Sequence, residues 1–288
     1  MEKEVLTQGM ELLRRPVLPL VSMVEFFLLT GDFAVVGEVI EQLPDPIETE
    51  YARYDDPAAL LAPYLEPLQW LIEVSRSAEL PFTVQDVAGE ELDLMSAATA
   101  IVDQRILTAE LEQINSLLCA PCGCTLCCTG PEAAMKQDFF EIPLQEEEVG
   151  RFAVEQLDSP ASRRTTAHAE ESLRVDGIPF YERPDSGLVH WADGWSLILP
   201  QGSRCPNLEA GSGRCLVYPD RPQVCRRPQI FPYILEPVRD ARGQLLGQRL
   251  RRSLLAVVDC PYVAALQDEI AAYAAASELE LVFKRNKE

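Results

Sequence analysis

Apolar residues recur at helical spacing through nearly all of the first 118 positions. They return every three or four residues, which places them on one face of an α-helix. The stretches with this spacing are 12–40, 60–72, 92–102 and 111–118. Gly31, Pro44 and Pro81 mark breaks between helices, and Thr108 is placed to cap the last of them. We therefore expect residues 1–118 to form a region built of helices.

The periodicity changes after residue 118. Pro121, Gly123 and the pair Gly130–Pro131 predict a tight, irregular turn rather than a continued helix. Beyond this turn, short apolar and aromatic runs separated by turn sequences indicate strands. The expected strands are 139–144, 180–183, 188–191 and 195–199, and the expected helices are 145–157 and a second within 161–174.

The C-terminal segment predicts a β-hairpin followed by a helix. Residues 230–238 and 245–258 would pair across the turn Asp240–Gly243. Pro261 then stands in the first turn of a helix, where a missing N–H is tolerated. Together these patterns predict an α+β fold that is mainly α, with a small antiparallel sheet and a C-terminal helix. We expect two domains, an acidic helical region at residues 1–118 and a cysteine-rich domain at residues 119–288.

Acidic residues dominate the charge of the chain, and most of that charge lies in the helical region. The net charge is −21 over 288 residues. Residues 1–118 carry 22 acidic and 6 basic side chains, a balance of −16. A field of that sign repels phosphate backbones, so we expect no nucleic acid partner. The plain interpretation is a solvated helical surface, and the alternative is a docking face for a basic partner protein.

The sequence shows neither an export signal nor a membrane span. The N-terminus, Met1–Glu4, lacks the basic region and apolar core of a signal peptide. The most apolar stretch, Val17–Ile40, is interrupted by Glu25, Asp32 and Glu38, which makes it too charged to cross a bilayer. We therefore expect a cytoplasmic protein that does not bind membranes. In that reducing compartment, clustered cysteines are expected to bind metal or take part in catalysis rather than form disulfides.

Nine cysteines are the candidate metal ligands. They are Cys119, Cys122, Cys124, Cys127, Cys128, Cys205, Cys215, Cys225 and Cys260. Cys119 and Cys122, and likewise Cys124 and Cys127, have the C-x-x-C spacing that lets one turn aim two sulfurs at one metal ion. Zinc and a cubane iron–sulfur cluster each take four ligands, so up to two four-cysteine sites are expected.

Arginines flank the second cysteine group. Arg204, Arg214 and Arg226 are each adjacent to a cysteine. Guanidinium groups beside an iron–sulfur cluster would offset its negative charge and donate hydrogen bonds to sulfur. For that reason, and because five thiols crowd residues 119–128, we favour an iron–sulfur cluster of the 4Fe–4S kind over zinc. The alternative for each arginine is an ion pair with a carboxylate, and for the nearby His190 a structural role is the stronger expectation.

At these residues the sequence resembles the YkgJ-like CxxCxxCC cysteine-cluster family, whose members are described as zinc- or iron-chelating. The matching segments are Cys124–Cys128, Cys205–Leu208, Cys215–Tyr218, Arg221–Pro222 and Cys225–Pro228. At the front, the family pattern has a cysteine where this chain has Pro121, and Cys119 and Cys122 stand nearby instead. The resemblance covers residues 119–262 and implies one metal site shared by both cysteine groups.

Three functions are consistent with these observations. The first is an iron–sulfur redox or electron-transfer component, which would act with a redox partner. The second is implied by the resemblance alone, because the family includes flagellin lysine N-methylase-like proteins: a protein-lysine N-methylase-like transferase. The third is a binding module that holds structural zinc without catalysis. The sequence shows no acid–base pair or phosphate-binding loop, so it predicts neither a substrate nor catalytic residues.

Overall fold

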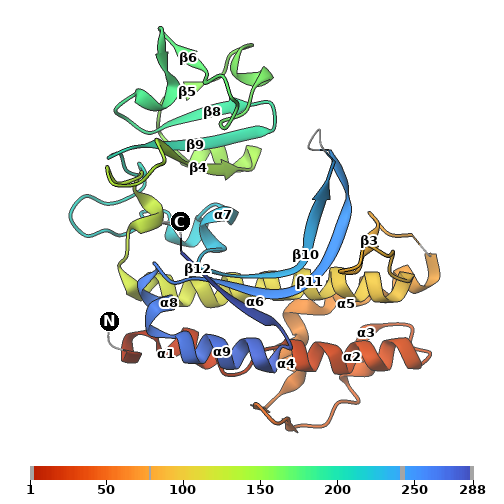
Figure 1. Cartoon of the computed structure of the whole chain (residues 1–288). Helices are drawn as coiled ribbons and strands as arrows, with labels where there is room; N and C mark the ends of the chain where they lie inside the picture. Colours follow the sequence, from red (N-terminus) through yellow and green to blue (C-terminus); the bar gives the residue numbers. More distant parts are fainter. Residues whose placement is uncertain (1–2, 78, 241–243, 286–288) are drawn as a thin grey trace. The chain divides into compact units, whose positions relative to one another are not determined.

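The computed structural model describes residues 3–77, 79–240 and 244–285 (Figure 1). Contacts within the chain divide it into two compact units. The helical unit comprises the described residues up to Cys122 and those from Gln229 onward, and the inserted unit comprises Gly123–Pro228. This division differs from the expected boundary between residues 118 and 119, because the C-terminal strands and helices share the core of the N-terminal helices.

Most of the helical unit consists of α-helices, as the sequence predicts. They are α1 Thr7–Leu13, α2 Leu18–Thr30, α3 Val36–Ile40, α4 Pro57–Leu61, α5 Leu65–Ser77, α6 Leu94–Cys122, α8 Pro261–Ala265 and α9 Gln267–Ala276, with the 3-10 turns η1 Lys3–Leu6 and η2 Ala62–Tyr64. Local signals explain some of the starts. Pro57 opens α4, and Asp56 caps it by accepting a hydrogen bond from Ala59 N at 3.1 Å.

Helix α6 is one continuous element where the sequence predicts two. Thr108, predicted to cap a new helix, lies in its interior and donates its hydroxyl to Gln104 O at 2.6 Å. The helix also runs through Pro121 to Cys122, where an irregular turn is predicted. Thirteen of its 29 residues are buried. Tertiary packing of this buried face outweighs the local signals that would end the helix.

A four-stranded sheet belongs to the same unit. Its strands are β10 Ile230–Arg239, β11 Leu245–Val257, β12 Glu280–Lys284 and β3 Val84–Gln85. β10 and β11 pair antiparallel, which confirms the predicted hairpin, and β12 and β3 each pair parallel with β11. Part of the predicted turn, residues 241–243, lies outside the described residues. A separate small hairpin joins β1 Ile47–Glu48 to β2 Arg53–Tyr54.

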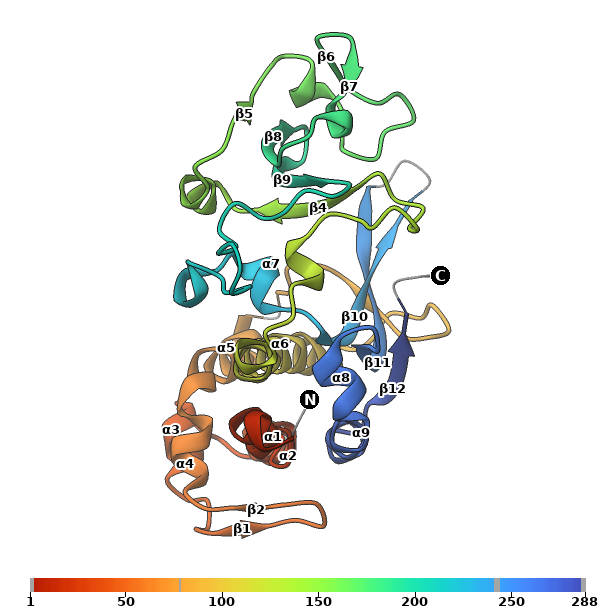
Figure 2. The same cartoon turned by 90° about the vertical axis from the view of Figure 1, so that its left-hand side faces the viewer.

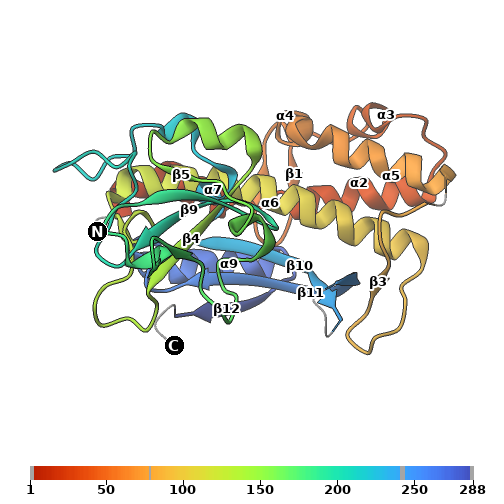
Figure 3. The ribbon, with the colours of Figure 1, turned by 90° about the horizontal axis from the view of Figure 1, so that it is seen from above.

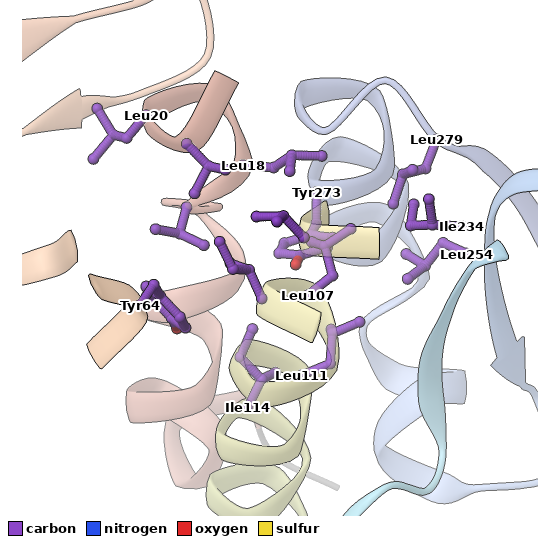
Figure 4. Close-up of a cluster of buried hydrophobic side chains, with 14 of the residues drawn as sticks. Leu18, Leu20, Tyr64, Leu107, Leu111, Ile114, Ile234, Leu254, Tyr273 and Leu279 are labelled. Atoms are coloured by element: carbon purple, nitrogen blue, oxygen red, sulfur yellow. The ribbon is translucent and has the colours of Figure 1, made fainter. Parts of the chain in front are cut away.

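The core of the helical unit surrounds α6. Figure 4 shows Leu107, Leu111 and Ile114 of α6 among side chains of α2, α9 and the β10–β11 hairpin. α1 contacts both α6 and α9 (Figure 2), and α2 and α5 both contact α6 (Figure 3). The last helices and strands of the chain therefore complete the core that the first helices begin.

One buried carboxyl ties this core together. Glu110 of α6 accepts hydrogen bonds from Val17 N at 2.9 Å and from the Tyr273 hydroxyl at 2.6 Å. Burial raises the pKa of Glu110 to about 7. Glu110 therefore joins the segment before α2 and helix α9 to the middle of α6.

The inserted unit is built on a second sheet. Its strands, in spatial order, are β4 Phe139–Leu144, β9 Gly194–Pro200, β8 Gly187–Trp191 and β5 Gln156–Leu157, antiparallel except for the pair β5–β8. Leu197 and Leu199 of β9 belong to one apolar cluster and Ile198 to another, so the sheet is covered on both faces. A two-strand hairpin, β6 Arg174–Val175 with β7 Ile178–Pro179, and the short helix α7 Gln223–Arg226 are further elements.

The predicted strands 139–144, 188–191 and 195–199 are confirmed, but other elements of this unit are not. The predicted helix 145–157 is only the 3-10 turn η4 Glu146–Arg151, which a capping box between Gln145 and Glu148 closes at its start. The predicted second helix is the turn η5 Ser162–Arg164, and residues 180–183 form the turn η6 Phe180–Glu182 instead of a strand. Val149 of η4 and Phe180 of η6 pack in the apolar clusters that cover the sheet.

The fold is α+β and mainly α, as the sequence predicts. The C-terminal helix predicted from Pro261 is present as α8 and α9, which meet at Leu266. No described helix is both long enough and apolar enough to cross a membrane.

Candidate metal centre

The structure divides the nine predicted ligands between the two units. The inserted unit holds Cys124, Cys127, Cys128, Cys205, Cys215 and Cys225, and the helical unit holds Cys119, Cys122 and Cys260. None of the nine forms a disulfide in the part of the chain that the structure describes. Cys119 and Cys122 lie at the end of α6 and pack against the apolar core of the helical unit. Cys260 is buried at the N-cap position of α8. The six thiols of the inserted unit form the candidate metal centre.

The first cysteine group is held by a 3-10 turn, η3 Leu126–Cys128. Cys128 N closes the turn by donating to Thr125 O at 2.8 Å. Leu126 N donates to the sulfur of Cys124 at 3.4 Å, which draws that thiol toward the same turn. The sulfurs of Cys127 and Cys128 lie 3.9 Å apart. One short segment therefore gathers three thiols.

Main-chain pairing places Cys205 beside this turn. Cys205 N donates to Cys128 O at 2.7 Å, and Gly130 N donates to Ser203 O at 2.9 Å. Position 130 requires glycine, because a Cβ there would lie 1.8 Å from Pro200 O. The two cysteine groups, distant in sequence, are thus joined through the backbone.

A tight hairpin returns Cys215 to the same region. Cys215 forms an antiparallel bridge with Leu208, and Leu216 N donates to Asn207 O at 2.8 Å. Gly213 has φ 70°, a left-handed conformation that favours glycine. The hairpin therefore sets Cys215 close along the backbone to the segment that carries Cys205.

Cys225 is carried by α7. Pro222 precedes the first turn of this helix. The carboxylate of Glu148, a residue only 4% exposed, accepts a hydrogen bond from Gln223 N at 2.8 Å, which anchors the helix start. Glu148 therefore links η4, an element near the sheet, to the helix that presents Cys225.

Charges or hydrogen bonds connect five of these thiols, those of Cys127, Cys128, Cys205, Cys215 and Cys225. The hydrogen bond to Cys127, together with burial, raises the pKa of Cys128. Burial and the neighbouring thiolates raise the pKa of Cys225 to about 12, and burial likewise raises the pKa of Cys205. By contrast, the hydrogen bond from Cys128 lowers the pKa of Cys127 to about 7, and Arg221 acts in the same direction. Thiols in this arrangement cannot all ionise unless a cation offsets their charge.

Arg221 is the arginine that acts on the thiols. It is 6% exposed, donates from Nε to Tyr218 O at 3.2 Å and stacks on the Tyr218 ring at 3.8 Å. Its charge lowers the pKa of both Cys127 and Cys225. The sequence pattern instead emphasises the arginines next to cysteines, two of which, Arg204 and Arg214, are exposed. In the sequence, Arg221 stands out only because the segment Arg221–Pro222 matches the pattern of the CxxCxxCC family.

Thiolates suit a thiophilic metal such as zinc or iron, but the sulfurs of the six cysteines do not surround one point. Among the described residues, no three thiol, imidazole or carboxylate groups are arranged to hold a metal ion. Two thiolates bound to one tetrahedral zinc ion lie ~3.8 Å apart, given Zn–S bonds of ~2.3 Å. The sulfurs of Cys127 and Cys128 are 3.9 Å apart. This pair has the spacing of two ligands of one ion.

The two histidines have carboxylate neighbours. His190 Nδ1 lies 3.3 Å from an oxygen of Asp158, and its ring stacks on Trp195 with centroids 4.5 Å apart. His168 Nε2 lies 3.2 Å from an oxygen of Glu141. These contacts agree with the structural role expected for His190.

Comparisons with known proteins identify this part of the chain. Residues 118–244 match the family model CxxCxxCC, described as "Putative zinc- or iron-chelating domain". The matched range contains every cysteine except Cys260. No curated protein and no solved structure gives a significant match. Over residues 118–244, the chain is therefore similar to the CxxCxxCC family of zinc- or iron-chelating domains.

Proposed function

We propose that the inserted unit chelates one zinc or iron centre through Cys127, Cys128, Cys205 and Cys225. The observation that carries this proposal is the main-chain pairing of Cys128 with Cys205, which joins two cysteine groups into one cluster. The charge of Cys127 acts on Cys128, Cys205 and Cys225, and the charge of Cys215 acts on Cys205 and Cys225. Cys124 lies close to Cys127 in sequence, and the hairpin brings Cys215 close to the segment that carries Cys205.

A four-thiolate set supports a structural or electron-transfer role. Four thiolates complete the coordination of a tetrahedral ion and leave no open position for a substrate. Zinc held in this way would stabilise the inserted unit, whereas iron would add a redox couple that a partner protein could use. The 3.9 Å spacing of the vicinal pair favours two sulfurs on one ion. Buried Arg221, whose charge acts on the thiols, favours an iron–sulfur cluster.

The identity of the metal is tested by anaerobic purification. Metal analysis, acid-labile sulfide and an absorption spectrum would be measured on the full chain. A colourless protein with one equivalent of zinc, and without iron or sulfide, would exclude the iron–sulfur interpretation. Brown protein with iron and sulfide in equal amounts, bleached by dithionite, would support the redox role.

The ligand set is tested by single serine substitutions. Cys128→Ser and Cys205→Ser are each expected to abolish stoichiometric metal, because both sulfurs belong to the same site. Cys260→Ser is the matched control, since Cys260 is buried in the core of the helical unit. If Cys205→Ser retains full metal content while Cys128→Ser loses it, the two cysteine groups do not share a site. The lysine N-methylase-like alternative rests on the resemblance alone and stays a prediction.

A further inference from the structure

Helix α2 of the helical unit presents large apolar side chains to solvent. Phe26 is 61% exposed, Leu29 45% and Phe27 41%. Phe26 and Leu29, three residues apart, lie on the same face of the helix, and the rings of Phe26 and Phe27 meet edge to face at 5.8 Å. After the helix, Val35 is 48% exposed. We call Phe26, Phe27 and Leu29 the α2 apolar surface.

Helix α2 buries Leu18, Leu20, Val21 and Val24, but at Glu25 and Phe26 its polarity is the reverse of that expected for a solvated helix. Glu25, which directly precedes the apolar surface, is 4% exposed, whereas the phenylalanine that follows it faces water. A solvated helix turns its apolar residues inward and its carboxylates outward. Exposed apolar surfaces rimmed by polar residues mark binding sites for other molecules. The outward face of α2 therefore has the character of an interface.

The chain around this surface is strongly acidic. Residues 16–52 contain no lysine or arginine. They contain the acidic residues Glu25, Asp32, Glu38, Glu41, Asp45, Glu48 and Glu50, all exposed except Glu25. Asp32 follows α2 directly, and Glu38 accepts a hydrogen bond from Ala34 N at 3.0 Å beside Val35. Arg76 of α5 reaches this part of the chain and donates to Phe33 O at 3.3 Å.

This charge selects the kind of partner. Anionic lipid surfaces and nucleic acids are repelled by a rim of carboxylates. A second copy of a chain with net charge −21 would bring the same carboxylates together. A segment with lysine or arginine on one side and apolar residues on the other would satisfy both the rim and the apolar surface.

We propose that the α2 apolar surface, with its acidic rim of Asp32, Glu38 and Glu41, binds a basic amphipathic helix of a partner protein. The exposed aromatic rings are the anchors, and the carboxylates orient the partner and speed its association. This binding is independent of the metal centre, because every residue of the surface belongs to the helical unit.

The test uses a fluorescein-labelled synthetic helix of leucine and lysine, titrated with the full chain and followed by anisotropy. The matched probe has glutamate in place of every lysine. Saturable binding of the lysine peptide, weakened at least 10-fold by 0.5 M salt, is expected, with none of the glutamate peptide. Two double variants separate the apolar contribution to binding from the electrostatic one. Phe26→Ser with Leu29→Ser removes two apolar anchors. Asp32→Lys with Glu41→Lys reverses the charge of the rim and leaves the apolar side chains unchanged. Each is expected to weaken binding at least 10-fold.

The control is Leu245→Ser with Leu246→Ser, at the start of β11, where the side chains are 44% and 60% exposed. This variant should bind the lysine peptide like the unmodified chain. Equal weakening by the control, or binding unchanged in both α2 variants, would overturn the proposal. If sedimentation shows a dimer, and the Phe26→Ser, Leu29→Ser variant is monomeric, the surface binds a second copy of the chain. If the chain binds anionic vesicles, and the same variant does not, the surface binds lipid. Either result contradicts the proposal.

Discussion

Gly130 decides whether the two cysteine groups can meet. Its N–H pairs with Ser203 O, and its α-carbon lies so close to the opposite strand that a Cβ would be 1.8 Å from Pro200 O. A Cβ atom that close to a backbone oxygen would force one of the two segments to shift. A side chain there would push apart the backbone segments that carry Cys128 and Cys205. The position therefore matters for metal binding although the residue has no ligand atom.

We expect Gly130→Ala to reduce metal content to well below one equivalent, because the pairing of Cys128 with Cys205 would open. The measurement is metal stoichiometry after purification, with affinity from competition against a chromophoric chelator. Gly150→Ala is the matched control, since a Cβ at that glycine would have no heavy atom within 4 Å. Equal metal content in both variants would show that the backbone pairing does not support the site.

A second effect at the scale of single residues concerns buried carboxyls of the helical unit. Burial raises the pKa of Glu110 from 4.5 to about 7, and burial together with the charge of Asp103 raises that of Glu25 to about 9. Each group binds its proton more tightly in the folded state. Their contribution to stability is therefore complete below pH 4.5 and is lost as pH rises, through pH 7 for Glu110 and through pH 9 for Glu25.

We expect the free energy of unfolding to fall between pH 5 and pH 8, and Glu110→Gln to make that fall smaller. At 1.36 kcal/mol per pKa unit, the Glu110 shift corresponds to on the order of 3 kcal/mol. Urea unfolding followed by far-UV circular dichroism at several pH values measures the slope. Glu66→Gln, an exposed position on α5, is the control. Parallel slopes for the unmodified chain and Glu110→Gln would contradict the expectation.

At the scale of elements, a bulge in β11 redirects one arginine into the helices. Arg252 has φ 48° at a register shift between β10 and β11, and its Nη1 lies 3.1 Å from Asp103 Oδ2 of α6. Asp103 is 2% exposed, whereas the Arg252 side chain is 37% exposed. The neighbouring Arg251 instead lies 3.7 Å from Glu236 on the surface. The bulge thus couples the sheet to α6 through one partly buried ion pair.

We expect Arg252→Met to lower the free energy of unfolding by about 2 kcal/mol, because Asp103 would keep its burial and lose its partner. The value lies below that of a fully buried pair, since the arginine is partly solvated. Arg251→Met, with the same change in side chain, should alter stability by less than about 0.5 kcal/mol. Chemical denaturation of both variants gives the comparison, and similar losses in the two would argue against the role of the bulge.

Elements whose signals are local were predicted well, and those that depend on distant packing were not. The β10–β11 hairpin and strands β4, β8 and β9 carry their own apolar patterns and turn residues. The single helix α6 contradicts two local signals, Thr108 and Pro121, because its buried face packs with the rest of the helical unit. Residues 145–157 have helical spacing, yet Val149 and Phe152 pack in the cluster against the sheet from a 3-10 turn.

At the scale of the whole molecule, the two units differ in how much apolar core supports them. The described residues of the inserted unit form two small clusters, of seven and five buried residues. The helical unit has one large core to which both ends of the chain contribute. A bound metal therefore matters more to the folding of the inserted unit.

We expect removal of the metal with a chelator and a thiol reductant to expose residues 123–228 to trypsin while the helical unit stays resistant. Arg174, Arg204 and Arg214 are exposed and offer cleavage sites in the inserted unit. Mass spectrometry of the fragments, with metal-loaded protein as the control, locates the cuts. If the cuts fall equally in both units, or if the loaded and stripped proteins are cut alike, metal binding and folding of the inserted unit are not coupled.

The sequence by itself determined the fold class, the candidate ligands and the resemblance to the CxxCxxCC family, because cysteine spacing and apolar periodicity are properties of the linear chain. Only the tertiary structure decided which thiols share a unit, since the pairing of Cys128 with Cys205 depends on Gly130 meeting a strand far away in sequence. It also showed that the end of the chain completes the core of the beginning, and that α2 turns Phe26 outward and Glu25 inward. Burial of a residue is set by all the elements around it, and a local pattern cannot contain that information.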